Sequence, residues 1–163
     1  MSRRELKPDL VLGEFLPYLL NRAGVKTGQT FSRDLEAFGL ILSDWRILIA
    51  LWQSEHQPLS VIAEMTVSDL STMSRQVRAL EKAGLIARQR STSDGRALNL
   101  VLTPKGKKMT AQIIPIAKSH ESAATQGITE KDLNTVRRCV SQIYQNLVAF
   151  DKQREESRQN QDL

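Results

Sequence analysis

Apolar residues recur at helical spacing in several stretches of the chain, and this pattern predicts a mainly α-helical protein. Residues 10–23 read as a first helix, in which Pro17 marks either a kink or a late start. Residues 32–40 suggest a short second helix. A clearer helix begins at Ser43, which can cap it, and ends before residues 56–58. The apolar face of that helix consists of Trp45, Leu48, Ile49 and Trp52, which we expect in the core.

Two closely spaced helices follow, and the two or three residues between them match the turn of a helix-turn-helix. Ser60 can cap the first of these helices. Either Ser68 or Asp69 can cap the second, which runs to about Ala83. Gly84 then supplies the left-handed residue that commonly ends a helix.

After Gly84 the apolar spacing changes from helical to strand-like. Residues 86–90 and 96–102 flank a polar turn that ends in Asp-Gly, which predicts a β-hairpin. Thr103 is expected to cap a further helix that has Pro104 at its first position.

Two long helices complete the pattern. The first runs to about Ala124 with a bend near Pro115, and Gly127 breaks it. The second opens near Thr129 and continues to about Phe150 or beyond. The predicted fold class is therefore mainly α with a small β-hairpin.

The helix from about residue 69 to 83 has two chemically different faces. Leu70, Met73, Val77 and Leu80 fall together on the side that we expect to be buried. Glu81 lies off the opposite face, which therefore carries no acid, whereas a merely solvated face usually mixes both signs. That opposite face consists of Ser71, Thr72, Arg75, Arg78, Ala79 and Lys82.

This polar face suits the major groove of double-stranded DNA. Arg75 can donate two hydrogen bonds to guanine, and Gln76 on the flank could pair with adenine. Ser71 and Thr72 lie in the first turn, which reaches deepest in such motifs. Phosphate contacts are expected of the two bases further along, Arg78 and Lys82.

The distribution of charge supports this interpretation. The chain of 163 residues has 23 basic and 18 acidic residues, a net charge of +5. Residues 58–108 alone hold nine bases and four acids, so the whole excess lies there. Such a segment is either the electrostatic footprint of a nucleic-acid surface or a solvated face that happens to be basic.

The predicted hairpin carries further charges, at Arg88, Arg90, Asp94 and Arg96. Arginines near the tip of such a wing can reach into the adjacent minor groove. Asp94 can pair with Arg96 or with Arg88 and hold the turn rigid.

The run LEKAGLIARQRSTSDGRALNLVLTPKG resembles the signature of the MarR family, the multiple antibiotic resistance regulators. The residues that match are Leu80, Glu81, Gly84, Leu85, Ile86, Arg88, Asp94, Arg96, Leu102, Thr103 and Gly106. The resemblance implies a single domain over residues 10–150, with a winged helix-turn-helix lobe over about 44–103. The helices of about 10–40 and 104–150 would then form a dimerisation lobe, flanked by a flexible basic tail (1–9) and a polar tail (151–163).

The resemblance also implies a homodimer that binds a pseudo-palindromic operator as a repressor. Many members release DNA when a small aromatic or phenolic effector binds between the dimer helices and the DNA-binding lobe, where Trp45 and Arg46 would lie. A buried Arg46 there would favour an anionic effector. Alternatively, Trp45 belongs to the core and Arg46 pairs with Asp44 at the helix surface.

Other function classes find little support in the sequence. His56 and His120 both look like surface residues, and there is neither a glycine-rich phosphate loop nor metal-ligand spacing, so we expect no catalytic residue, no metal and no cofactor. A winged helix used for protein contact remains an alternative, although the acid-free face argues against it. No apolar run approaches about 20 residues, and we expect a cytoplasmic protein without membrane contact. The one cysteine, Cys139, is expected to be buried and inert.

Overall fold

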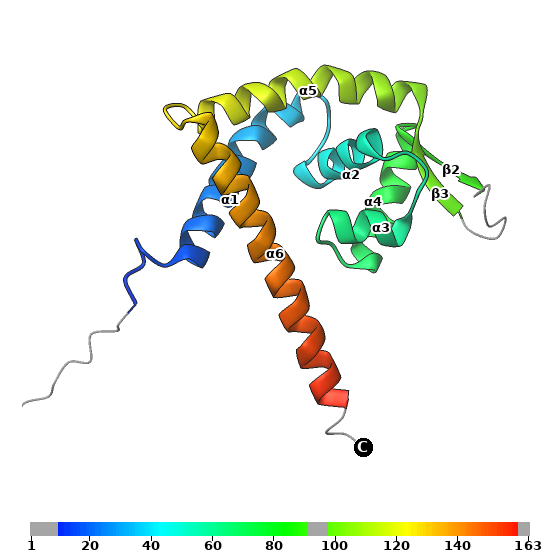
Figure 1. Ribbon diagram of the computed structural model, residues 1–163. Coiled ribbons are helices and arrows are strands. Elements are labelled where there is room, and N and C mark those ends of the chain that lie inside the picture. The colour runs from blue at the N-terminus through cyan, green and yellow to red at the C-terminus, as the bar shows by residue number, and fades with distance from the viewer. Residues whose placement is uncertain (1–9, 91–97, 160–163) are drawn as a thin grey trace, which may run out of the picture. The chain divides into compact units, whose positions relative to one another are not determined.

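The computed structural model describes residues 10–90 and 98–159, which form six helices and a three-stranded antiparallel sheet (Figure 1). The chain divides into two compact units, Met1–Glu121 and Ser122–Leu163. The predicted fold class, mainly α with a small β-hairpin, is confirmed.

Helix α1 (Leu16–Glu36) is one continuous helix where the sequence suggested two. Pro17 lies in its first turn, so the late-start interpretation is right. The prediction of a break was wrong because a glycine in a helix interior costs only about 1 kcal/mol, and the helix continues through Gly24 and Gly28. A Cβ added at Gly28 would lie only 3.0 Å from the Leu42 side chain, so this glycine allows α1 to pass close to the next helix.

Helix α2 (Leu42–Gln53) begins one residue before the predicted cap, Ser43. Instead, the backbone N–H of Ile41 donates to Asp44 Oδ2 at 3.0 Å. Trp45 is buried as predicted, but Trp52 is 42% exposed, which corrects its assignment to the core. The spacing could not decide this because α2 is apolar on nearly all sides, and other residues fill the core positions.

The helix-turn-helix consists of α3 (Leu59–Met65) and α4 (Leu70–Lys82). Helix α3 begins at Leu59 with Pro58 in the capping position, so the prediction of Ser60 was wrong. For α4 the cap is Asp69, one of the two residues proposed. Leu70 is 56% exposed rather than buried, because as the first residue of α4 it precedes the part of the helix that the core covers.

The sheet has the strand order β1-β3-β2. Strands β2 (Ile86–Arg90) and β3 (Leu98–Leu102) form the predicted hairpin, with Ile86 opposite Leu102 and Arg90 opposite Leu98. The sequence did not reveal β1 (Gln57–Pro58), because two residues show no strand periodicity. The hairpin turn, with Asp94 and Arg96, lies outside the described residues.

Helix α5 (Pro104–Ala124) continues through Pro115. As predicted, Thr103 caps it: the Gly106 N–H donates to Thr103 Oγ1 at 3.0 Å. The same hydroxyl donates to the Gly84 carbonyl oxygen at 2.7 Å, where Gly84 has the predicted positive φ of 71°. One threonine side chain therefore joins the end of α4 to the beginning of α5.

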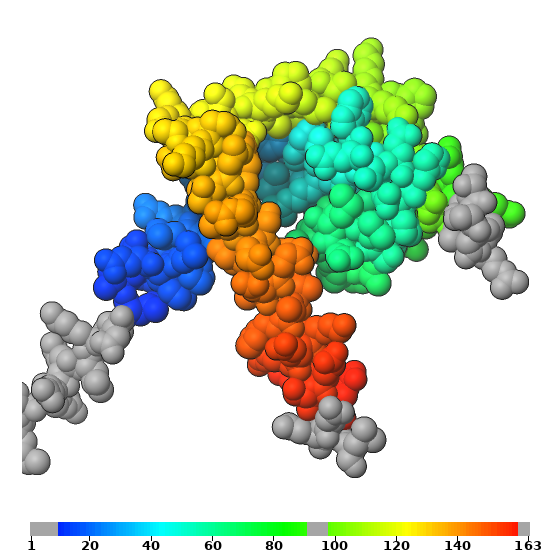
Figure 2. All heavy atoms as spheres, in the orientation of Figure 1, coloured from blue at the N-terminus to red at the C-terminus, as the bar shows by residue number. Residues whose placement is uncertain are grey.

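The core of the first unit lies between α2, α3, α4 and the sheet, and α2–α4 form one continuous packed body (Figure 2). Helices α1 and α5 close this core with Phe31, Leu35 and Ile113. Consequently α4 is held firmly from inside by Met73 and Val77, which are fully buried.

In the second unit, α6 (Glu130–Gln159) follows Gly127, whose φ is 81°. None of its described residues is buried. Cys139 is exposed, which corrects the expectation of a buried thiol. Of the helices described, none combines the length and the apolar character that a membrane span requires.

Candidate nucleic-acid interface

The polar face of α4 is exposed as the sequence predicted. Ser71, Arg75, Arg78 and Lys82 are exposed, and Thr72 is half-buried. The side chain of Gln76 departs from the prediction, because its Oε1 is buried without a hydrogen-bond partner among the described residues. Gln76 is thus partly withdrawn from the surface that its neighbours form.

Asp69 organises the first turn of this helix. Its Oδ1 accepts hydrogen bonds from the Thr72 backbone N–H at 2.8 Å and from Ser71 Oγ at 2.6 Å. The bond from the Ser71 hydroxyl, followed by bonds from the backbone N–H and the side chain of Thr72, holds the pKa of the Asp69 carboxyl well below its ordinary value. Asp69 is therefore a carboxylate at neutral pH. Sequence reasoning treated it only as a cap and missed its bond to Ser71.

Arg75 also has a partner on its own helix. Its Nη2 donates to Thr72 Oγ1 at 3.3 Å, near the upper limit for a hydrogen bond. A guanidinium has five N–H donors, so most of them stay available for another molecule.

Arg88 forms an ion pair that the sequence did not indicate. Its Nε donates to both carboxylate oxygens of Glu81, at 3.0 and 3.2 Å, and ties β2 to the last turn of α4. Of the two partners suggested for Asp94, Arg88 is thus already paired with another acid. Arg90, at the end of β2, is exposed.

Two lysines of the basic segment also have partners within the fold. Lys105 Nζ donates to the Ala83 carbonyl oxygen at 2.8 Å. Lys107 forms an ion pair with Glu55, and its hydrogen bond and charge lower the pKa of that carboxyl. The nine bases counted in the sequence therefore overstate the cationic surface that is free to meet a ligand.

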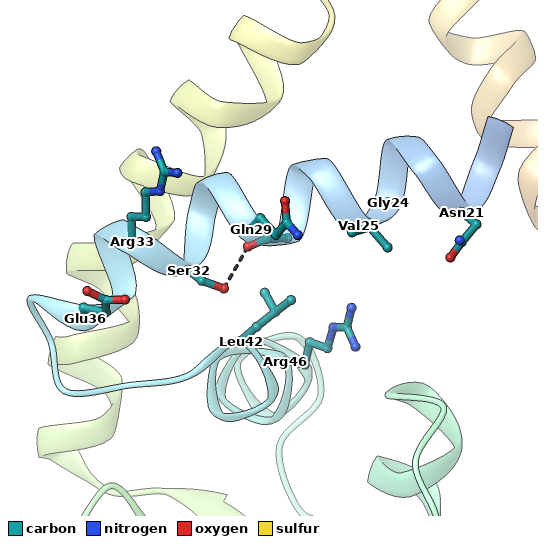
Figure 3. A pocket seen from close by; sticks show the side chains of 10 residues that line it. Asn21, Gly24, Val25, Gln29, Ser32, Arg33, Glu36, Leu42 and Arg46 are labelled. Atoms are coloured by element: carbon teal, nitrogen blue, oxygen red, sulfur yellow. Dashed lines mark hydrogen bonds between the residues drawn. The ribbon is translucent and has the colours of Figure 1, made fainter. Parts of the chain in front are cut away.

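A separate pocket of about 730 Å³ lies between α1 and α2. Leu42 and Arg46 extend from α2 toward α1, as Figure 3 shows. Arg46 is exposed rather than buried, and it has no ion-pair partner within residues 10–90 and 98–159. Trp45 does not line the pocket but packs edge-to-face on Phe31, so the core interpretation of Trp45 holds. The lining residues are Asn21, Gly24, Val25, Gly28, Gln29, Ser32, Arg33, Glu36, Leu42 and Arg46.

Comparison with known proteins identifies the chain. A model of the MarR family matches residues 40–98, which span α2 to the beginning of β3. The structure of a MarR family transcriptional regulator from Silicibacter pomeroyi is 30% identical over 83% of this chain and 91% of that one, with a TM-score of 0.79. The chain belongs to the MarR family.

Other MarR relatives agree with this assignment. The transcriptional repressor IacR of Pseudomonas putida is 24% identical over 82% of this chain and 80% of its own length. The MepR–DNA complex of S. aureus has the same fold, with a TM-score of 0.73 at 22% identity over 81% of this chain and 96% of that one. This MarR chain is a DNA-binding transcriptional regulator of a non-enzymatic family, which confirms the predicted class and the prediction that it is not an enzyme.

Proposed function

We propose that the protein is a homodimeric repressor that binds a pseudo-palindromic operator, with α4 in the major groove and the hairpin at the minor groove. The observation that carries the proposal is the exposed, acid-free face of α4 on a helix that Met73, Val77 and Leu80 anchor in the core on its other side. A rigid helix with bases and hydroxyls on its outer face suits readout of base edges.

The residues of this surface divide by role. Arg75 is proposed to read guanine, with Gln76 on the flank, and Arg78 and Lys82 to contact phosphates. Ser71 and Thr72 face the bases from the first turn. The proposed wing contacts come from Arg90 and Arg96, with Arg88 and Asp94 as supporting residues.

Helix α6 supplies the argument for a dimer. Its apolar residues alternate at intervals of four and three, the spacing of a seam between paired helices. In the isolated chain Val140, Leu147 and Phe150 are 42–57% exposed, and a second copy would cover them. The full seam consists of Val136, Val140, Ile143, Leu147 and Phe150.

The MepR–DNA complex supports the DNA-bound state of this fold by analogy. We accordingly propose the lobes that the sequence indicated: DNA-binding residues at about 44–103, and dimerisation residues at about 10–40 and 104–150. The tails 1–9 and 151–163 would lie outside both lobes.

Mobility shifts with genomic fragments, together with light scattering, test this function. We expect retarded complexes that survive nonspecific competitor DNA and a particle of twice 18.4 kDa. If no fragment is retarded at low salt, the winged helix is instead a protein-contact module.

We further propose that the pocket between α1 and α2 binds a small, partly apolar, anionic aromatic effector that weakens DNA binding. Its volume of about 730 Å³ lies in the range of small-molecule sites. Val25 and Leu42 offer apolar contacts, while Arg46 offers a cation that has no ion-pair partner among residues 10–90 and 98–159. A screen of benzoates and salicylates by thermal shift and DNA release tests this, and no response at millimolar concentration would refute it.

A further inference from the structure

The hydroxyl of Ser71 donates its proton in one fixed direction. A serine hydroxyl has one proton to donate and two lone pairs to accept with. Its proton lies in the 2.6 Å bond to Asp69 Oδ1, because an ionised carboxylate can only accept. The lowered pKa of Asp69 means that the acid stays ionised, so this direction does not change at neutral pH. Ser71 Oγ is therefore presented to solvent as an acceptor alone.

We propose that Ser71 is a specificity-determining residue that accepts a hydrogen bond from an exocyclic amino group in the major groove, N6 of adenine or N4 of cytosine. This inference rests on the proposed entry of α4 into that groove. A free hydroxyl reads donors and acceptors alike, whereas one held by Asp69 rejects the keto oxygens, N7 atoms and phosphates, all of which are acceptors. The negative charge behind Ser71 also strengthens its oxygen as an acceptor.

The neighbouring hydroxyl of Thr72 is less available to another molecule. Thr72 Oγ1 already accepts the Nη2–H of Arg75, and the Thr72 side chain also contributes a hydrogen bond that lowers the pKa of Asp69. Ser71 is exposed whereas Thr72 is half-buried, so Ser71 presents the more accessible acceptor oxygen. Helix capping alone does not require the Ser71 bond, because the cap is completed by the Thr72 backbone N–H bond to Asp69.

The experiment first selects bound duplexes from a randomised library, using the full chain and its Ser71→Ala variant. We expect Ser71→Ala to flatten the preference at one base pair of each half-site and to leave the others unchanged. Lys82→Ala serves as the control, since loss of a phosphate contact should weaken all duplexes alike. Thermal melting of each variant monitors folding.

Base analogues then test whether Ser71 accepts a hydrogen bond from an amino group at that base pair. Purine in place of adenine, or 2-pyrimidinone in place of cytosine, removes the amino group, and we expect roughly three- to tenfold weaker binding of the parent protein. Ser71→Ala should show none of this loss. Changing the keto group of the opposite base, with 4-thiothymine or 2-aminopurine, should leave the parent's affinity unchanged.

A third variant tests the part of Asp69. Glycine caps a helix nearly as well as aspartate, so Asp69→Gly releases the Ser71 proton without losing the helix. We expect the penalty for removing the amino group to shrink in Asp69→Gly. An unaltered penalty there, a loss that follows the keto group, or a Ser71→Ala profile identical to the parent's would each overturn the inference. If the parent enriches no duplex at all, the proposed DNA-binding function fails instead, so the two failures are distinguishable.

Discussion

The salt dependence of DNA binding should distinguish lysines that are free to contact phosphates from lysines that are already paired with an acid of the same chain. Lys82 lies on the exposed face of α4 with no ion-pair partner in the described part of the chain. Lys107 has the same chemistry but is paired with Glu55. We therefore expect Lys82→Ala to weaken DNA binding and Lys107→Ala to leave it nearly unchanged.

The size of the effect follows from counterion release. Each phosphate neutralised contributes about 0.9 to the slope of log K against log salt. A dimer loses two contacts when Lys82 is replaced, so the magnitude of the slope should fall by about 1.8. If the curves of parent and variant meet near 1 M salt, this difference corresponds to roughly 30-fold weaker binding at 0.15 M.

Fluorescence anisotropy of a labelled duplex measures the slope of log K against log salt for the parent and for each variant. The salt range is about 0.05 to 0.3 M, which brackets physiological ionic strength. Lys107→Ala is the matched control, since it removes the same charge from a site occupied by Glu55. Equal slope changes in the two variants would contradict the division between free and paired cations.

Three further predictions address specificity, packing and signal. Arg75→Ala should relax base choice at one position of each half-site, at a cost of about 1–3 kcal/mol for the matched base, which in vitro selection measures. Gly106→Ala should destabilise the fold by about 1–3 kcal/mol or more, because its Cβ would lie 1.9 Å from the Leu85 carbonyl oxygen. Gly24→Ala, which meets nothing within 4 Å, should instead stabilise the helix by about 0.5–1 kcal/mol, and a fall in melting temperature for both variants would show that the packing argument is wrong. Arg46→Ala should blunt DNA release by benzoates while leaving DNA affinity intact, and a titration that matches the parent's would show that Arg46 does not bind the effector.

Helix ends could be predicted from the sequence where a capping residue, a glycine or a proline marks them. The Gly84 stop and the Thr103–Pro104 start lie where the sequence indicated, and the cap of α4 is Asp69, one of the two residues proposed, because each depends on residues next to it in the chain. Helix α1 was divided wrongly because Gly24 and Gly28 interrupt the apolar pattern without ending the helix.

The candidate site shows the same limit. The face of α4 could be predicted from spacing alone, but not which charges remain free. The Arg88–Glu81 and Lys107–Glu55 pairs join residues seven and 52 positions apart, and no local pattern marks them. The burial of Gln76 Oε1 and the exposure of Arg46 likewise depend on elements that only the fold brings together.

The hydroxyl of Thr103, shared between Gly84 and Gly106, couples the beginning of α5 to the end of α4. The end of α4, the exit of the hairpin and the beginning of α5 meet at this one side chain. We therefore expect a tilt of the first turns of α5 to move the end of α4 and the base of the hairpin with it. A signal that tilts α5 could then change the orientation of α4 and the hairpin without unfolding either of them.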